Sequence, residues 1–181
     1  ESDFRTKYEL SSKPIIAILP GSRKQEIKAK LPIMLDSVKD FSNYEIIVAG
    51  APSLDIEFYT PCFSASNVKI IHGKTYDILS LAEAAIVTSG TATLETALFE
   101  IPEVVCYKAS SISYSIAKRL VKIKYISLVN LIMDREVVKE LIQHECNASA
   151  IKKELSSLIV GGKKRAEVLK NYKILKEKLG S

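Results

Sequence analysis

Two short segments of the sequence combine glycine with residues that can bind an anion. The first is Gly21-Ser22-Arg23, which directly follows an apolar run. A glycine at that place lets the backbone turn tightly and approach a ligand, and an arginine can form two parallel hydrogen bonds to a phosphate. From the tripeptide alone, a solvated surface arginine explains Arg23 equally well.

The second segment is Ser89-Gly90-Thr91, which stands between an apolar run and a helical pattern. The first turn of a helix offers free N–H groups and the positive end of the helix dipole, so it can hold an anion. The hydroxyls of Ser89 and Thr91 would add donors, and Glu95, about one turn into the helix, could accept both hydroxyls of a ribose. The alternative is an ordinary helix cap beside a surface glutamate. The segment has no lysine and matches neither common nucleotide-binding signature.

Both segments fall where strands of a parallel sheet are expected to end. Buried strands are predicted by short apolar runs at Pro14–Pro20, Tyr44–Gly50, Asn67–Gly73, Ala84–Ser89 and Pro102–Lys108. Helical patterns separate these runs. The alternation indicates a Rossmann-like α/β fold, a parallel sheet with helices on both faces. Ligands of such sheets bind beyond the carboxyl ends of the strands.

Helices are predicted from apolar residues at helical spacing and from their flanking residues. They cover Gly21–Phe41 with an interruption at Pro32, Ser53–Phe63, Thr75–Ala84 with Thr75 as N-cap, Thr91–Ile101, Ser110–Ile123, Arg135–Gln143, Ala148–Gly161 and Lys163–Leu179. The segment Lys124–Ile132 is expected to be partly extended. We divide the chain into a linker (residues 1–13), the Rossmann-like domain (14–160) and a basic C-terminal helix (161–181).

The composition is that of a globular domain from a reducing compartment. The 181 residues, 47% hydrophobic and 26% charged, suffice for one domain with a sizeable core. No apolar run reaches the roughly 18 residues of a membrane span. The polar start lacks a signal-peptide segment and a Met, so we expect a fragment. Three widely spaced cysteines argue against a disulfide framework or a zinc site, and we expect neither metal nor other cofactor.

A net charge of +5 would allow binding to phosphates, nucleic acid or an anionic membrane. No nucleic-acid-binding motif is visible, so no nucleic-acid partner is expected. One basic segment stands out, with four cations and no acid: Lys118, Arg119, Lys122 and Lys124. Its apolar residues keep helical spacing, and a basic amphipathic helix can lie on an anionic membrane. The pattern alone favours the simpler interpretation, a solvated helix face.

Other polar residues are weaker candidates. His72 ends a predicted strand and could contact a ligand, although a lone histidine is more often structural. His144 and Cys146 have no metal-ligand partners nearby in the sequence. Asp134 and Glu136 are interpreted as charges at a helix start.

Three ordered blocks resemble the lipid-A-disaccharide synthase family, glycosyltransferases with the two-domain GT-B fold. The blocks are "LPGSRKQEIKAKLPIML", "SGTATLETALFEIPEVVCYK" and "AKRLVKIKYISLVNLIMDREVVKELIQHEC", and the similarity runs from about Pro14 to the C-terminus. Within the third block, Val129 stands where the family usually has proline. The resemblance implies that this chain is the C-terminal, donor-binding half of such a fold. The N-terminal half, which carries the acceptor side and the general base, has no counterpart in it.

The resemblance also implies an activity and roles for individual residues. The enzyme would transfer 2,3-diacylglucosamine from its UDP donor to 2,3-diacylglucosamine 1-phosphate (lipid X) and release UDP, without a catalytic metal. The residues implicated in UDP-sugar binding are Gly21, Ser22, Arg23, His72, Gly73, Ser89, Gly90, Thr91, Glu95 and Asn130. Arg23 and Asn130 would be catalytic, Arg23 by stabilising the leaving diphosphate. Glu95 would bind the ribose, and the backbone near His72 and Gly73 would bracket the uracil.

Because the implied substrates are lipids, we interpret the basic segment as a membrane contact. The contact would be made by Lys118, Arg119, Lys122 and Lys124. The implied location is cytoplasmic, peripheral on the inner face of the bacterial inner membrane, with the lipid acceptor held through the absent N-terminal domain. The last helix could be loosely packed or exchanged with a second copy, so a homodimer is allowed. Two other functions stay open: another UDP-sugar enzyme of this fold, such as a 2-epimerase, and a non-enzymatic nucleotide- or membrane-binding module.

Overall fold

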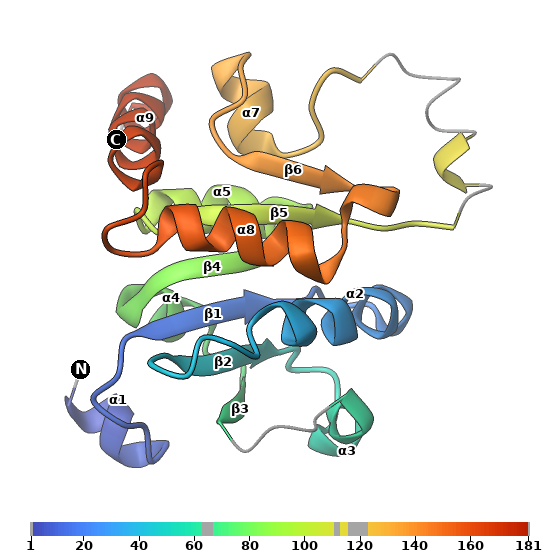
Figure 1. Cartoon of the computed structure of the whole chain (residues 1–181), viewed down its shortest axis with the longest axis vertical. Helices are drawn as coiled ribbons and strands as arrows, with labels where there is room; N and C mark the ends of the chain where they lie inside the picture. Colours follow the sequence, from blue (N-terminus) through green and yellow to red (C-terminus); the bar gives the residue numbers. More distant parts are fainter. Residues whose placement is uncertain (1, 63–66, 111–112, 116–122, 181) are drawn as a thin grey trace.

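A parallel sheet forms the centre of the protein in the computed structural model, which describes residues 2–62, 67–110, 113–115 and 123–180 (Figure 1). Within these ranges the sheet has six strands in the order β3-β2-β1-β4-β5-β6, and every neighbouring pair is parallel. The strands are β1 (Ile15–Leu19), β2 (Glu45–Gly50), β3 (Val68–His72), β4 (Ala82–Thr88), β5 (Glu103–Tyr107) and β6 (Lys139–Ile142). The predicted Rossmann-like α/β fold is therefore confirmed.

Helices cover both faces of this sheet. They are α1 (Ser2–Lys7), α2 (Lys24–Ser37), α3 (Ile56–Tyr59), α4 (Thr75–Leu81), α5 (Thr91–Leu98), α7 (Leu128–Met133), α8 (Ala148–Leu158) and α9 (Arg165–Leu179). In Figure 1, α2 and α8 lie in front of the sheet, and α4 and α5 lie behind it. The predicted helix Ser110–Ile123 falls mostly outside the described ranges, as do Lys118, Arg119 and Lys122.

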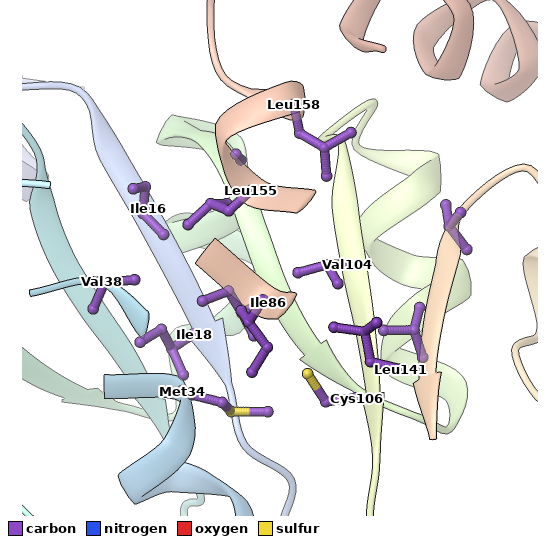
Figure 2. Packing of buried hydrophobic residues seen from close by; sticks show 14 of the residues in the cluster. Ile16, Ile18, Met34, Val38, Ile86, Val104, Cys106, Leu141, Leu155 and Leu158 are labelled. Carbon is purple, nitrogen blue, oxygen red and sulfur yellow. The ribbon is translucent and has the colours of Figure 1, made fainter. Parts of the chain in front are cut away.

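The core consists of two apolar layers: one lies under α2 and α8 and also takes in residues of α5, α7 and α9, and the other lies under α4. All five residues of β1 are buried, as expected for a strand covered on both sides. Ile16 and Ile18 belong to the layer under α2 and α8, whereas Ile15 and Ala17 belong to the layer under α4. Figure 2 shows Ile18 close to Ile86 on the neighbouring strand. The side chain of Met34 lies between the sheet and the helices of the first layer. Alternating side chains of one strand thus fix both helical layers.

The segment expected to be a linker packs onto the domain. Residues 1–13 contain helix α1, and Phe4, Tyr8 and Leu10 lie against the second apolar layer. The ammonium of Lys69 on β3 donates a hydrogen bond to the carbonyl of Tyr8 at 3.0 Å. This segment is therefore part of the folded unit.

The region between β5 and α8 differs from the prediction. The helix expected at Arg135–Gln143 is replaced by strand β6, whose residues pair with β5. The segment expected to be extended contains helix α7, capped by Ser127, whose side chain accepts from the N–H of Asn130. Asp134 is the left-handed C-cap of α7 and not a helix-start charge. The open edge of β5 offered strand pairing to β6, and this tertiary context overrode the local pattern.

Smaller corrections concern helix α4. Lys74 is its N-cap, and Thr75 is already the first helical residue, without a side-chain capping bond. The helix ends at Leu81, so β4 begins two residues earlier than predicted.

Helix α9 packs on its own domain. Val168, Tyr172 and Leu175 are buried in the first apolar layer. At its start, Nη1 of Arg165 donates to the carbonyls of Glu83 (2.8 Å) and Leu158 (2.9 Å). The loose packing that the sequence allowed is therefore not found.

Candidate functional site

The two glycine-containing segments lie side by side. Strands β1 and β4 are direct neighbours, so the loops that follow them meet at the carboxyl edge of the sheet. They line one cavity of about 450 Å³, which we call the edge pocket. The residues of this pocket used below are Gly21, Ser22, Arg23, Glu26, Thr88, Ser89, Gly90, Thr91 and Glu95. The edge pocket lies where ligands of parallel α/β sheets bind.

The turn after β1 requires glycine. Gly21 has φ +99°, and a Cβ there would lie 2.9 Å from Oε2 of Glu26 and 3.2 Å from Cγ2 of Thr88. Arg23 is the N-cap residue of α2, with an extended backbone and no side-chain capping bond. Its side chain is exposed and lines the edge pocket. A cation near a helix start opposes the helix dipole, so an anion held in the pocket would favour this placement.

The turn after β4 leads into a helix start that faces the pocket. Gly90 is the N-cap of α5 with φ +141°, and a Cβ there would meet open space. The N–H of Ser89 donates to the carbonyl of Cys106 at 3.0 Å, which fixes the loop to β5. Thr93 turns back, its hydroxyl donating to the carbonyl of Gly90 at 2.8 Å. Thr91 and Ala92, the first two residues of α5, line the edge pocket, so the start of the helix borders it, as anion binding needs.

Glu95 faces the edge pocket and is held there by Tyr76. The carboxylate is half-buried and lines the pocket. The hydroxyl of Tyr76 on α4 donates to Oε1 of Glu95 at 3.0 Å, and the Tyr76 ring packs against Phe99 with 5.5 Å between centroids. This hydrogen bond to a carboxylate raises the pKa of the Tyr76 hydroxyl. Sequence reasoning found Glu95 but missed Tyr76.

His72 and Gly73 lie beside the edge pocket and are not among its lining residues. The His72 ring sits under Gly50, where an added Cβ would lie 2.7 Å from Nδ1. Nδ1 is 3.2 Å from the carbonyl of Ala51, and the ring meets Tyr59 edge-on. Nε2 is buried without a hydrogen-bond partner among the described residues. His72 thus supports the loop after β2, which does line the pocket.

Asn130 lies away from the edge pocket in a buried hydrogen-bond network. Oδ1 accepts from the N–H groups of Val137 (2.7 Å) and Val138 (3.0 Å). Nδ2 donates to the carbonyl of Val138 (2.8 Å) and to Oε1 of Glu140 (3.0 Å). With two donors and two acceptor sites, the amide is fully used. The geometry gives Asn130 a role in tying α7 to β6, and the catalytic role implied by resemblance stays a prediction.

A buried lysine stands behind the edge pocket. Lys30 is only 2% exposed, and its ammonium donates a hydrogen bond to the hydroxyl of Thr88, at the end of β4. Burial lowers the pKa of this ammonium. Sequence reasoning passed over Lys30, although it occupies the same helix face as Ile27, Leu31 and Met34. A lysine among core positions is the signal that could have identified it.

The basic segment predicted to touch a membrane is described only in part. Lys124 is exposed, 3.4 Å from Oδ1 of Asp134 and above the ring of Tyr125. None of the helices in the described ranges is both long and apolar enough to cross a membrane.

The sequence matches the family profile described as lipid-A-disaccharide synthetase over residues 3–180. It is 35% identical over 184 residues to a lipid-A-disaccharide synthase of Myxococcus xanthus, covering 98% of this chain and 48% of that protein. It is 36% identical over 172 residues to a lipid-A-disaccharide synthase of Syntrophus aciditrophicus, covering 91% of this chain and 45% of that protein. The chain thus spans about half the length of the curated relatives it matches.

Solved glycosyltransferases share the fold. The calicheamicin glycosyltransferase CalG4 aligns with a TM-score of 0.59 at 15% identity, covering 94% of this chain and 40% of that one. The spinosyn rhamnosyltransferase SpnG, in complex with thymidine diphosphate, aligns with a TM-score of 0.60 at 13% identity, covering 94% of this chain and 42% of that one. At such identities the likeness concerns the fold alone, and it agrees with one Rossmann-like half of a GT-B glycosyltransferase.

Proposed function

The chain belongs to the lipid-A-disaccharide synthase family, and we propose that it is the donor-binding half of a glycosyltransferase that makes the lipid A disaccharide. The reaction transfers 2,3-diacylglucosamine from its UDP donor to 2,3-diacylglucosamine 1-phosphate, with release of UDP. The observation that carries the proposal is the edge pocket, where Arg23 and the start of α5 lie on neighbouring loops beside Glu95. This set suits a nucleoside diphosphate, which needs hydrogen-bond donors and a cation for its phosphate oxygens and an acceptor for its ribose hydroxyls.

In the proposed reaction, a hydroxyl of the acceptor attacks the anomeric carbon of the donor sugar. The bond from this carbon to the diphosphate oxygen breaks, and its electron pair leaves with UDP. The hydroxyl proton goes to a base on the other half of the enzyme. Negative charge grows on the diphosphate, so groups that are already oriented toward it lower the barrier. Arg23 supplies the positive charge, and the loop Ser89–Thr91 supplies N–H and hydroxyl donors.

Glu95 has a different part in this proposal. A carboxylate that accepts both ribose hydroxyls would fix the nucleoside and therefore the position of the diphosphate it carries. His72, placed under the loop after β2, would shape the wall on which the base rests. The lipid acceptor would be held by the N-terminal half, at the cytoplasmic face of the inner membrane.

Arg23→Ala in a full-length enzyme tests the proposal. Removing one preorganised charge-stabilising group lowers turnover by about 10²–10³-fold in comparable sites, and we expect a loss of that size. Lys28→Ala is the matched control, because Lys28 lies on the same helix outside the lining of the edge pocket and should keep normal turnover. Near-normal turnover of Arg23→Ala would remove the role assigned to it.

Two further measurements separate the proposal from its alternatives. Calorimetry with UDP should show binding, which a purely membrane-docking module would lack. Product analysis after incubation with UDP-N-acetylglucosamine should show no epimerised sugar nucleotide. Formation of the 2-epimer would contradict the transferase assignment.

A further inference from the structure

A second cavity opens directly beside the edge pocket. It has a volume of about 750 Å³ and lies between α2 and the segment after β5. Its lining residues used below are Arg23, Lys24, Glu26, Lys30, Ser89, Lys108, Ala109 and Ser110, and we call it the lysine pocket. Arg23, Glu26 and Ser89 line both cavities. Ligands in the two cavities would therefore lie on either side of these shared residues.

The lysine pocket carries a surplus of positive charge. Arg23, Lys24, Lys30 and Lys108 face a single carboxylate, that of Glu26. Across the described ranges, none of these four cations is within salt-bridge distance of an acid. A concave surface lined by one sign of charge concentrates its field and attracts an oppositely charged ligand. If Arg23 serves the diphosphate in the edge pocket, three lysines are left without an anion.

Lys30 shows that this pocket is more than a patch of surface lysines. The residue is 2% exposed, yet it lines the cavity. An ammonium has three donors, and in the described part of the chain Lys30 uses one, toward Thr88. A buried charge with unused donors is costly unless an anion meets it. Burial lowers the pKa of this ammonium, and an anion bound beside it would raise that pKa again.

The opposite wall of the pocket is held in place by Gln143. The N–H of Ala109 donates to Oε1 of Gln143 at 2.8 Å, and Nε2 of Gln143 donates to the carbonyl of Ala109 at 3.2 Å. Gln143 itself has φ +55°, which is uncommon for a residue other than glycine. This two-bond clamp fixes the backbone between Lys108 and Ser110, both of which line the pocket. This wall of the pocket is therefore positioned by contacts within the protein.

We propose that the lysine pocket binds a phosphate monoester, the one carried by the sugar 1-phosphate acceptor. This inference rests on the proposed function. The diphosphate of the donor is accounted for in the edge pocket, and the acceptor is the other substrate that carries phosphate. Its reacting hydroxyl must reach the carbon bonded to the diphosphate, so its own phosphate, across one sugar ring, falls near the donor loops. The two cavities share Arg23 and Ser89, as expected if the donor diphosphate and the acceptor phosphate lie next to each other.

The test uses a full-length enzyme and two acceptors, the sugar 1-phosphate and the same diacylated sugar without phosphate. Lys108→Gln and the double variant Lys24→Gln/Lys108→Gln remove exposed cations of the pocket. Losing a hydrogen bond to a charged group costs about tenfold or more in affinity, so we expect KM for the phosphorylated acceptor to rise by about that factor per lysine. KM for the dephosphorylated acceptor and the Kd for UDP should not change. Lys28→Gln, on α2 outside the pocket, is the control and should leave all three values unchanged.

Four outcomes would overturn the assignment. Weaker UDP binding with an unchanged acceptor KM would mean that the lysines serve the donor. Equal losses for both acceptors would mean that they act on the fold, which thermal melting of the variants would also show. If the variants bind UDP normally and their KM for the phosphorylated acceptor is unchanged, the lysine pocket does not bind the acceptor phosphate. The proposed function would then still stand. A wild-type enzyme that neither binds UDP nor transfers sugar would overturn the proposed function, and the acceptor assignment with it.

Discussion

Tyr76 determines how Glu95 is presented to the edge pocket. The carboxylate of Glu95 would otherwise be free to change rotamer at the end of a flexible side chain, whereas the hydrogen bond from Tyr76 and the packing of its ring on Phe99 hold it. If Glu95 binds ribose hydroxyls, Tyr76 is a positioning residue for nucleotide recognition.

Tyr76→Phe tests this role with two nucleotides. Removal of one hydrogen bond of about 0.5–1.5 kcal/mol should weaken UDP binding by about 2–10-fold. Binding of 2′,3′-dideoxy-UDP, which lacks the hydroxyls that Glu95 would accept, should change little. Calorimetry on a full-length enzyme provides both constants. An equal loss for the two nucleotides would show that Tyr76 acts on the shape of the pocket and not through Glu95.

Glu103 is a buried acid that forms no ion pair in the described part of the chain. Its residue is 0% exposed, Oε1 accepts from the hydroxyl of Tyr172 at 3.3 Å, and Oε2 has no hydrogen-bond partner among the described residues. Desolvation by burial raises the pKa of this carboxyl well above its usual range. The folded protein therefore keeps the proton after the unfolded chain has lost it.

This shift predicts a dependence of stability on pH. Below the ordinary pKa of 4.5, Glu103 is protonated in both states and its contribution to stability is fully present. As the pH rises toward the folded-state pKa, the free energy of unfolding falls by up to about 1.4 kcal/mol per pH unit. Glu103→Gln keeps a neutral group of the same shape, so it should be more stable than the wild type at neutral pH. Urea denaturation of both proteins across this range measures the difference, and parallel pH curves would contradict it.

At the level of elements, a strand was predictable where its own residues determine it. The apolar runs at β1, β2 and β4 are buried along most of their length, so composition alone identified them. Strand β6 was missed because it has only four residues, two of them Lys139 and Glu140. Its stability comes from pairing with β5 and from the side chain of Asn130, contacts that no local pattern contains.

The residues of the candidate site also divide into those that local sequence patterns reveal and those that depend on contacts distant in sequence. Gly21-Ser22-Arg23 and Ser89-Gly90-Thr91 were recognisable because glycine at a strand end and donors at a helix start are local features. Lys30, Tyr76 and Gln143 were not identified, because each acts through a residue distant in sequence.

Asn130 joins helix α7 to strand β6, and its loss should loosen both. Asn130→Ala leaves the buried N–H groups of Val137 and Val138 without a partner, and Glu140 loses one of its hydrogen bonds. Each unsatisfied buried group costs about 1–3 kcal/mol, so we expect the two N–H groups to lower the free energy of unfolding by about 2–6 kcal/mol. Asn43→Ala, at an exposed asparagine, is the matched control and should stay within about 0.5 kcal/mol of the wild type. Full stability of Asn130→Ala together with lost turnover would instead place Asn130 in contact with substrate.

At the scale of the whole molecule, both cavities open at one end of the sheet. The edge pocket and the lysine pocket are built from loops that follow β1, β4 and β5, so they share the carboxyl edge. Under the proposed function, the half of the relatives that this chain does not match would face this edge and complete the site. Helix α9 lies on the domain itself and leaves that edge open.

The net charge of +5 bears on the proposed membrane location. A basic segment gains about 1 kcal/mol per cation near an anionic bilayer. A full-length enzyme should therefore sediment with vesicles that contain phosphatidylglycerol and not with phosphatidylcholine alone. Raising the salt concentration should release it, since exposed charges are screened beyond about 10 Å at 0.1 M ionic strength.

A variant pair locates the membrane contact within the chain. One variant replaces the cations of the basic segment by glutamine: Lys118, Arg119, Lys122 and Lys124. The other removes the same charge from four exposed lysines of the C-terminal region: Lys163, Lys170, Lys173 and Lys178. If the basic segment is the contact, the first variant should lose vesicle binding by a factor of about 100 or more, and the second should keep it. The reverse result would assign the contact to α9, and equal losses would mean that only the net charge matters.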